Sequence, residues 1–300
     1  MTPLLRAQLI PPALDWPREA ACQPAPAGVL LAPGSNIALD VHGDPVRARL
    51  TVLSDGNHHM ALADAVQAFA ERYREVGDVF YLTTPPRILL DVLARQRLVL
   101  GNLTLPVSPG VFISPRPILD RLHEQGRIGA PTTFAASRGT AVLVAKGNPL
   151  GIAAIPDLLR ADVRLVLSNP VTEAASYAVY AAAIADASAG PDRDHASIAA
   201  RLAGERVLKS RIIHHREIPE LIAAGHADGS LVYRHLALNY VRIFPDQFEI
   251  AIMTDEPVTH FAIATVEPCR EHARSFVEFF TSGEVAQYYE SHGLTRVLVA

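Results

Sequence analysis

The feature that most constrains this chain is a repeating unit of apolar run, polar turn and amphipathic stretch. Residues 50–53 form a short apolar run typical of a buried strand, and residues 54–57 form a polar turn after it. Residues 60–74 then place apolar side chains at helical spacing. A strand that is apolar on both faces has to be covered by helices on both sides. The unit therefore predicts an α/β fold with mostly parallel sheets flanked by helices.

The same unit recurs along the 300 residues, which are enough for two lobes of ordinary size. Further apolar runs predict strands at residues 79–82, 111–114, 141–145, 163–167, 207–213, 229–233, 248–253 and 261–266. Helical spacing predicts helices at residues 87–95, 117–125, 172–187, 219–224 and 271–289. Residues 1–47 are rich in Pro and Gly, so we expect them to form an extended arm.

Composition excludes several classes of protein. A formal net charge of −4 argues against a nucleic-acid binder, which carries a basic excess on one face. No apolar run reaches the roughly 18 residues that a membrane-spanning helix requires, so no span is expected. Cys22 and Cys269 form neither a disulfide framework nor a metal knuckle. Residues 1–21 lack the continuous apolar core of a secretion signal, so we expect a cytoplasmic protein as written, and a periplasmic one if a leader has been removed.

Motifs for catalysis are missing from the sequence. It contains no GxSxG elbow, P-loop, HExxH or CxxC, and no GxGxxG follows a predicted strand. Ser54 or Ser168 could be combined with a histidine and Asp55 into a triad, but nothing in their spacing supports one. We therefore expect a protein that is not an enzyme and that has no cofactor.

Polar turns follow three of the predicted strands, at residues 54–59, 83–86 and 168–173. Ligands of open α/β sheets bind at the carboxyl ends of the strands, where backbone N–H groups and helix N-termini point at them. Helix capping alone explains Ser, Thr, Asp or Asn in any one such turn. Three such turns at corresponding strand ends favour a binding site.

Five segments carry a family resemblance. They are LTVLSDGNHHMALADAVQAFAERY, YLTTPPRILLDVLARQ, GTAVLVAKGNPLGIAAIPDLLRADVRLVLSNPVTEAASYAVY, IIHHREIPELIAAGHADGSLVYRH and FVEFFTSGEVAQYYESHGL. In this order they resemble the type II periplasmic solute-binding proteins, specifically the molybdate-binding-like branch of ABC-transporter substrate-binding proteins. The resemblance covers about residues 48–295 and leaves the arm unexplained.

The resemblance implies a two-lobed fold with a ligand cleft between the lobes. One lobe would comprise residues 48–137 and 236–300, the other residues 138–235, with crossings near residues 139–145 and 231–236. It implies a monomer that closes on a small oxyanion such as molybdate or tungstate, without catalysis. The partners would be that small anionic ligand and, for an exported form, an ABC permease. A cytoplasmic form would store, sense or deliver the ligand.

The resemblance also assigns ligand-binding residues. Members of the family hold the anion with backbone N–H groups, Ser and Thr hydroxyls and one Tyr. Carried onto this sequence, the assigned residues are Gly56, Asn57 and His58 in the first turn, Thr83 and Thr84 in the second, Val171 and Thr172 in the third, and His215, Arg216 and Tyr233 on the opposite wall.

Departures from the family pattern leave an alternative open. The family's usual run of small residues in the first turn is replaced by Asp55-Gly56-Asn57-His58-His59. Carboxylates in the cleft would repel a dianion, so the ligand could instead be larger, zwitterionic or metal-bearing. A metal ion would suit imidazole and carboxylate ligands. The candidate ligands are His58, His59, His214 and His215, with Glu173 or Asp55 as the carboxylate. Adjacent histidines point in different directions, so only one of each pair can face a shared site. A cytoplasmic sensor that reuses the fold is a further alternative.

Overall fold

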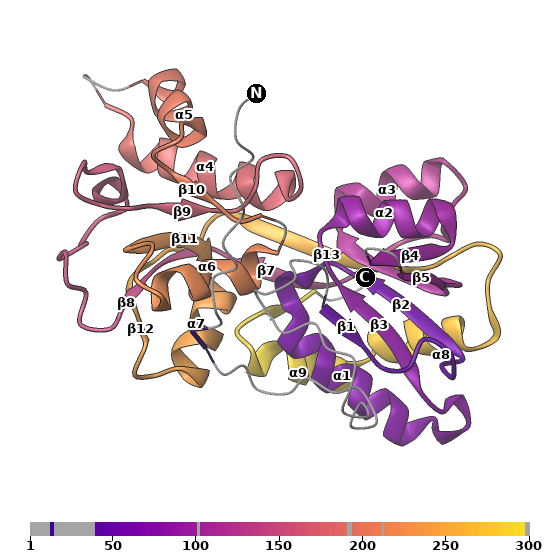
Figure 1. Ribbon diagram of the computed structural model, residues 1–300. Helices are drawn as coiled ribbons and strands as arrows, with labels where there is room; N and C mark the ends of the chain where they lie inside the picture. Colours follow the sequence, from indigo (N-terminus) through magenta and orange to yellow (C-terminus); the bar gives the residue numbers. More distant parts are fainter. Residues whose placement is uncertain (1–12, 15–39, 101–102, 191–193, 212, 298–300) are drawn as a thin grey trace.

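The computed structural model describes residues 13–14, 40–100, 103–190, 194–211 and 213–297, which form two lobes, each built on its own β-sheet. In Figure 1 the smaller sheet and helices α4–α7 lie on the left, and the larger sheet with α1–α3, α8 and α9 lies on the right. No helix among these described residues is long and apolar enough to cross a membrane.

The larger sheet has three parallel strands at its centre and antiparallel strands toward its edges. Strand β2 (Leu50–Ser54) pairs in parallel with β3 (Val79–Thr83) on one side and with β6 (Val111–Pro115) on the other. The antiparallel strands are β1 (Asp40–His42) beside β3, then β13 (Val258–Thr265), β7 (Thr132–Arg138) and β14 (Thr295–Arg296) beyond β6.

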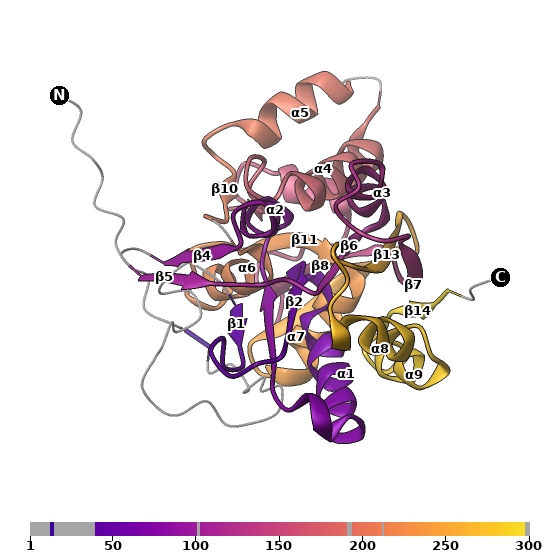
Figure 2. The ribbon, with the colours of Figure 1, turned by 90° about the vertical axis from the view of Figure 1, so that its right-hand side faces the viewer.

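Helices cover both faces of this sheet, as the apolar strands require. Alternate strand residues point to opposite faces, so Val52 and Leu53 belong to different cores. One face packs against α1 (His59–Arg72), α8 (Glu271–Phe280) and α9 (Gly283–Ser291). The other face packs against α2 (Pro86–Arg95) and α3 (Arg116–Glu124). Figure 2 shows these two groups of helices on opposite sides of the strands.

The second lobe has a smaller sheet and a single large core. Strand β8 (Thr140–Ala145) lies between β11 (Gly229–Tyr233) and β12 (Phe248–Met253). A bridge between Leu165 and Gly229 places the short parallel pair β9 (Val166–Leu167) and β10 (Leu208–Lys209) beside β11. The helical elements of this lobe are η3 (Ile155–Leu159), α4 (Ala174–Ser188), α5 (His195–Ala203), α6 (His214–Ala223) and α7 (Arg234–Ile243).

Two connections between the lobes lie against each other. Gly139 joins β7 to β8 at a φ of +73°, and a Cβ there would lie 1.8 Å from the carbonyl oxygen of Thr254, so only glycine fits. The Thr254 N–H donates to the Thr140 carbonyl at 2.8 Å. Strand β12 precedes this second connection and pairs with β8, so residues 236–253, which we predicted in the first lobe, pack with the second.

Helix α6 begins at His214 rather than at residue 219, and β10 covers only part of the strand predicted over residues 207–213. Pro219 lies inside this helix and has no N–H to donate to the His215 carbonyl one turn earlier. The Tyr240 hydroxyl donates to that carbonyl instead, at 2.8 Å. This tertiary hydrogen bond satisfies the turn that the proline leaves open and places His214 and His215 in the first turn of α6.

The N-terminal arm is described only in part. Within residues 1–47, β1 forms an edge strand instead of a loop, and Leu14 is buried in the core of the second lobe. The Ala13 N–H donates to Glu220 Oε2 at 2.6 Å. The rest of the predicted arm, including Cys22, lies outside the described residues.

Sequence reading also missed several elements and merged two others. It missed β1, β7, β14, α5, α7 and a hairpin formed by β4 (Arg97–Leu100) and β5 (Leu103–Pro106). The helix predicted over residues 271–289 is two helices, α8 and α9, with a break at Thr281 and Ser282.

Candidate functional site

The carboxyl ends of the three parallel strands bring polar side chains together. In register, Ser54 at the end of β2 pairs with Thr83 of β3 and with Ile113 of β6. The residues that follow, Asp55, Thr84 and Ser114, therefore lie side by side at one edge of the sheet. All three are completely buried.

Several buried polar atoms at this edge have no hydrogen-bond partner among the described residues. They are Asp55 Oδ2, Asn57 Oδ1, Thr84 Oγ1 and Ser114 Oγ. More than nine-tenths of buried polar groups in proteins are hydrogen-bonded, because leaving one unpaired costs about 1–3 kcal/mol. The concentration of such atoms at strand ends indicates a ligand site.

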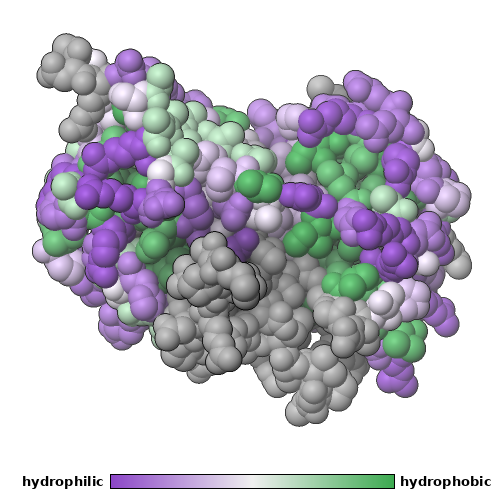
Figure 3. Space-filling model, turned by 45° about the horizontal axis from the view of Figure 1, so that its top comes forward, coloured by the Kyte–Doolittle hydropathy of each residue, from purple (hydrophilic) through white to green (hydrophobic). Residues whose placement is uncertain are grey.

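A cavity of about 20 Å³ lies next to these atoms, between the lobes. That volume holds about one water molecule, so the lobes are close together. The outline of the molecule in Figure 3 is indented between the lobes. The cavity is lined by Asp55, Gly56, Asn57, Pro85, Pro86 and Pro115 of the first lobe and by Glu173, Ala175, Ser176, His214 and His215 of the second.

Helix N-termini surround the cleft cavity from both lobes. Helices α2 and α3 each begin directly after a proline N-cap, Pro85 and Pro115, which both line the cavity. Helix α4 begins after Glu173, and α6 begins at His214. The first N–H groups of a helix have no partner within the helix, and the helix dipole places partial positive charge there. This arrangement favours an anion in the cleft.

The first loop, residues 54–59, is fixed from behind by two buried histidines. His58 Nε2 lies 3.2 Å from Ser54 Oγ, and His58 Nδ1 lies 2.8 Å from the Tyr289 hydroxyl. The His235 ring binds the Asn57 carbonyl at 2.5 Å. Burial lowers the pKa of His58 to about 3 and that of His235 to about 4. Both rings are therefore neutral at physiological pH, and they hold the loop without adding charge to the cleft.

Asp55 is the exceptional group of the first loop. Its Oδ1 accepts the Asn57 N–H at 2.9 Å, while Oδ2 has no partner within the described part of the chain. Burial raises the pKa of Asp55 to about 7, although the hydrogen bonds from Asn57 and the His214 charge act to lower it. Near neutral pH this carboxyl is therefore present in both protonated and ionised forms.

Glu173 lies on the opposite wall and is satisfied within its own lobe. Its Oε1 lies 2.6 Å from His214 Nδ1, the His214 N–H donates to the carboxylate at 3.0 Å, and Ser210 Oγ donates at 2.7 Å. Burial acts to raise the pKa of Glu173, but the His214 charge and the hydrogen bonds from His214 and Ser210 outweigh it and hold the pKa below its usual value. Glu173 is therefore an ionised group whose charge its neighbours balance.

The His215 ring packs over the first loop. A Cβ on Gly56 would lie 1.9 Å from His215 Cε1, so any other residue at this position would displace the His215 ring. The same ring stacks on His59 with the centroids 5.0 Å apart. The two lobes thus contact each other directly beside the cleft cavity.

The predicted ligand residues divide into two groups. Gly56, Asn57 and His215 line the cleft cavity, and Thr84 lies next to it with an unpartnered hydroxyl among the described residues. The other predicted residues lie away from the cavity or already have hydrogen-bond partners.

In the first lobe, Thr83 Oγ1 pairs with His42 Nε2 at 3.0 Å, and His58 lies behind the loop. In the second lobe, Tyr233 is buried at the end of β11, and burial raises the pKa of its hydroxyl even though hydrogen bonds with Thr259 and Ser176 lower it. Arg216 is buried on α6 and does not line the cavity.

In the third turn, the backbone N–H groups are occupied. Asn169 Oδ1 accepts the N–H of Val171 at 2.8 Å and that of Thr172 at 3.1 Å. The Val171 side chain is 64% exposed. The structure therefore does not direct the donors of this turn into the cavity.

Sequence reading missed Ser114 and Ser176 as cleft groups. It considered Asp55 as a source of repulsion, as a metal ligand and as a member of a triad, but not as a buried carboxyl with a raised pKa. One signal could have found Ser114. In both Thr84-Pro85 and Ser114-Pro115, a hydroxyl residue at a strand end is followed by a proline that caps a helix. Ser176 is the third residue of α4, within its first turn, and carries no comparable signal.

The metal hypothesis depended on bringing histidines and a carboxylate together. His58 faces the interior of the first lobe, while His214 binds Glu173 and the Tyr180 hydroxyl. No group of three or more His, Cys, Asp or Glu side chains that could hold a metal ion occurs in the part of the chain that the structure describes.

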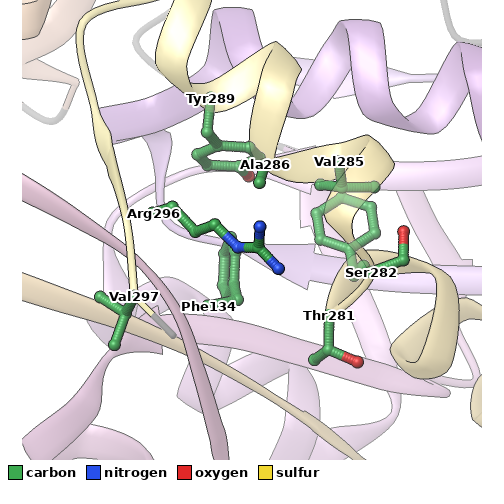
Figure 4. Close-up of a pocket in the computed structure, with 9 residues that line it drawn as sticks. Phe134, Thr281, Ser282, Val285, Ala286, Tyr289, Arg296 and Val297 are labelled. Atoms are coloured by element: carbon green, nitrogen blue, oxygen red, sulfur yellow. The ribbon is translucent and has the colours of Figure 1, made fainter. Parts of the chain in front are cut away.

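A larger cavity, of about 150 Å³, lies away from the cleft beneath α9. Figure 4 shows the Arg296 guanidinium pointing into it, with Tyr289 above, Phe134 below and Ser282 farther to the right. None of the predicted ligand residues lines it. We therefore assign the candidate site to the cleft.

Comparison with known proteins agrees with this geometry. The family described as bacterial extracellular solute-binding proteins matches residues 50–295. No curated protein sequence matches the chain. The match confirms the predicted resemblance to solute-binding proteins.

Solved structures share the fold. The sulfate-binding protein SubI from Mycobacterium tuberculosis has a TM-score of 0.61 at 18% identity, covering 83% of this chain and 86% of its own. The periplasmic molybdate-binding protein of Azotobacter vinelandii has a TM-score of 0.56 at 16% identity, covering 84% of this chain and 100% of its own. The tungstate ABC transporter protein of Geobacter sulfurreducens has a TM-score of 0.56 at 12% identity, covering 81% of this chain and 97% of its own. These likenesses confirm the predicted two-lobed α/β fold.

Proposed function

The chain belongs to the bacterial extracellular solute-binding proteins, and from this membership we propose that its two lobes close on a small tetrahedral oxyanion of the molybdate and tungstate type. In transport, the closed lobes would dock on an ABC permease. In a cytoplasmic setting, they would store, sense or deliver the anion. Binding requires no chemistry on the ligand, so we propose no catalytic step.

The observation that carries the proposal is the row of unpartnered polar atoms at the strand ends, within the described residues. The hydroxyls of Thr84 and Ser114 are donors that lie beside the N-termini of α2 and α3. Fixed donors and helix dipoles can hold an anion without a cationic side chain. They would replace its hydration shell with hydrogen bonds that are already positioned.

The second lobe supports the proposal through its charge balance. Glu173 would repel an anion if it stood alone, but its pairing with His214 and Ser210 offsets its charge locally. The N-termini of α4 and α6 remain as the polar features of this wall. An anion that contacts both lobes favours the arrangement in which they are close, so binding would shift the population toward closure.

Binding is tested by calorimetry and thermal shift with molybdate, tungstate and sulfate. An anion at about 100 times its dissociation constant should stabilise the protein by about 2.7 kcal/mol. The double variant Thr84→Ala with Ser114→Ala should weaken binding by about tenfold or more, because hydrogen bonds to charged groups contribute about 1.5–3 kcal/mol each.

Thr104→Ala is the matched control, since Thr104 is exposed on β5 and does not line the cleft cavity. It should bind like the wild type. Equal affinities of the double variant and the control would show that the strand ends do not hold the anion. If none of the three anions binds, the proposed ligand class is wrong.

A further inference from the structure

The larger cavity beneath α9, called the α9 cavity below, contains a positive charge without a counter-charge among the described residues. The Arg296 guanidinium points into this cavity (Figure 4). Arg296 forms no ion pair with a carboxylate of the described residues, and none of the described residues that line the cavity is Asp or Glu. A guanidinium is always charged and carries five N–H donors. The cavity therefore offers a charged donor group that lacks an acceptor.

The N-terminus of α9 adds partial positive charge beside this guanidinium. A Cβ on Gly283, the first residue of α9, would lie 3.7 Å from Arg296 Nη2 and 3.9 Å from Nη1. The first N–H groups of a helix have no partner within it, and its dipole is positive at this end. The first-turn carboxylate of Glu284 is paired with Arg72, with 2.9 Å between Oε2 and Nη1. Two positive features thus lie next to each other, and an anion between them would stabilise both.

Ser282 gives an independent indication of a ligand. It is the N-cap of α9, where a serine side chain ordinarily accepts an N–H of the first turn, but its side chain makes no such bond. Its Oγ is buried and has no hydrogen-bond partner within the described part of the chain. The other two hydroxyls that line the cavity are occupied. The Tyr289 hydroxyl lies 2.8 Å from His58 Nδ1, and the Thr281 hydroxyl donates to the Val277 carbonyl at 3.0 Å.

The remaining wall of the α9 cavity selects the kind of anion. It is apolar and is formed by the side chains of Phe134, Phe280, Val285, Ala286 and Val297 and the ring of Tyr289. An apolar cavity of this volume, about 150 Å³, is large enough for a benzene ring. Arg296 lies at the exposed end of the cavity and balances one negative charge. Its planar fork of N–H groups matches the two oxygens of a carboxylate.

We propose that the α9 cavity is a second binding site, for a small organic carboxylate with a compact apolar body. The carboxylate pairs with the Arg296 guanidinium and accepts hydrogen bonds from Ser282 Oγ and from the first N–H groups of α9. The apolar body packs between Phe134 and the Tyr289 ring. This site shares no lining residue with the cleft cavity among the described residues, so it does not depend on the anion proposed for the cleft.

The experiment is isothermal titration calorimetry on the full chain with benzoate, benzamide and acetate. Benzoate should bind with a Kd of about 1 mM or below, which is ordinary for a ligand of this size. Benzamide keeps the ring but lacks the charge, and it should bind at least about tenfold more weakly because it loses the charge-assisted hydrogen bonds. Acetate keeps the charge but lacks the ring, and it should bind at least about tenfold more weakly because it buries less apolar surface. If benzamide or acetate binds as tightly as benzoate, the proposed ligand class is wrong.

Three variants assign the binding to the α9 cavity. Arg296→Gln should weaken benzoate binding by about tenfold or more, because hydrogen bonds to charged groups are the stronger kind. Ser282→Ala, which removes one neutral donor, should weaken it by about threefold. Arg274→Gln is the matched control, since Arg274 is exposed on α8 and does not line the cavity, and it should bind like the wild type. Equal benzoate affinities of Arg296→Gln and Arg274→Gln would overturn the proposal.

A second measurement uses the wild type alone and is independent of how the variants fold. In amide NMR spectra, benzoate should cause its largest shifts at residues 282–285 and at Arg296, and smaller ones at residues 55–57 of the cleft. Largest shifts at residues 55–57 would place benzoate in the cleft and overturn the second site. The absence of any benzoate binding would overturn it as well. Neither result would contradict the oxyanion proposed for the cleft, which is tested by its own titrations.

Discussion

The two walls of the cleft both contain buried polar side chains, but they differ in whether those side chains have hydrogen-bond partners among the described residues. The first-lobe wall leaves Asp55 Oδ2, Asn57 Oδ1, Thr84 Oγ1 and Ser114 Oγ without partners among the described residues. The second-lobe wall satisfies Glu173 with His214 and Ser210, and His214 also reaches the Tyr180 hydroxyl. The first wall is therefore built for contact with something outside the chain, while the second is built mainly for its own stability.

The difference teaches how burial acts on two carboxyls in one cleft. Both lose contact with water, which by itself raises a carboxyl pKa. For Glu173, the His214 charge and the hydrogen bonds stabilise the ionised form more than burial destabilises it, so the pKa lies below the usual value. Asp55 has fewer compensating contacts, and its pKa rises to about 7. The number of partners, and not burial alone, decides which carboxyl is charged.

The largest expected effect comes from breaking the satisfied wall. Glu173→Ala leaves His214 and Ser210 without their buried partner, and removing one member of a buried charged pair destabilises a protein by about 3–5 kcal/mol. Urea unfolding at neutral pH measures this loss. Because the folded pKa of Glu173 is lowered, its ionic contribution is fully present above the unfolded value of 4.5 and is lost as the pH falls through the lower folded pKa. A loss that stays constant down to about pH 3 would show that Glu173 stabilises the lobe by packing alone.

Asp55→Asn should act in the opposite direction on the unliganded protein. The folded pKa of Asp55 is raised to about 7 from 3.8, so the fold accommodates the protonated carboxyl better than the ionised one. The stability that the protonated carboxyl retains is fully present below pH 3.8 and is lost as the pH rises through about 7. Replacing it with a neutral isostere should therefore stabilise the protein by about 2–4 kcal/mol at pH 8 and by almost nothing at pH 4. Thermal midpoints of the variant and the wild type across this range measure the difference. A variant that is less stable at pH 8 would contradict the assignment of Asp55 as a poorly compensated group.

Much of the first-lobe wall was predictable because it depends on local sequence. The strands at residues 50–53, 79–82 and 111–114 are apolar on both faces, and their order along the chain places their ends together. Asn57 and Thr84 follow directly from those strand ends. The position of Asp55 at a strand end was also predictable. Its protonation state was not, because it depends on burial and on contacts with residues distant in the sequence.

The second-lobe wall was harder to predict because long-range contacts determine it. Glu173 and His214 are far apart in sequence and meet only in the folded lobe. The start of α6 depends on the Tyr240 hydroxyl, which replaces the N–H that Pro219 lacks. Strand β12 joins the smaller sheet although the family resemblance implied the first lobe. In each case a tertiary hydrogen bond or strand pairing overrides the local signal.

The smallest expected effect tests whether the third turn is part of the site at all. Thr172→Ala should change the anion affinity by less than about twofold, because Asn169 already accepts the Thr172 N–H and the Thr172 hydroxyl lies 3.5 Å from the Arg211 carbonyl. Calorimetry beside Thr84→Ala, a substitution of the same residue type on the unsatisfied wall, gives the comparison. A loss of tenfold or more in Thr172→Ala would mean that the turn rearranges on binding and releases its donors to the anion. The two walls would then differ in when their polar groups become available, and no longer in whether they do.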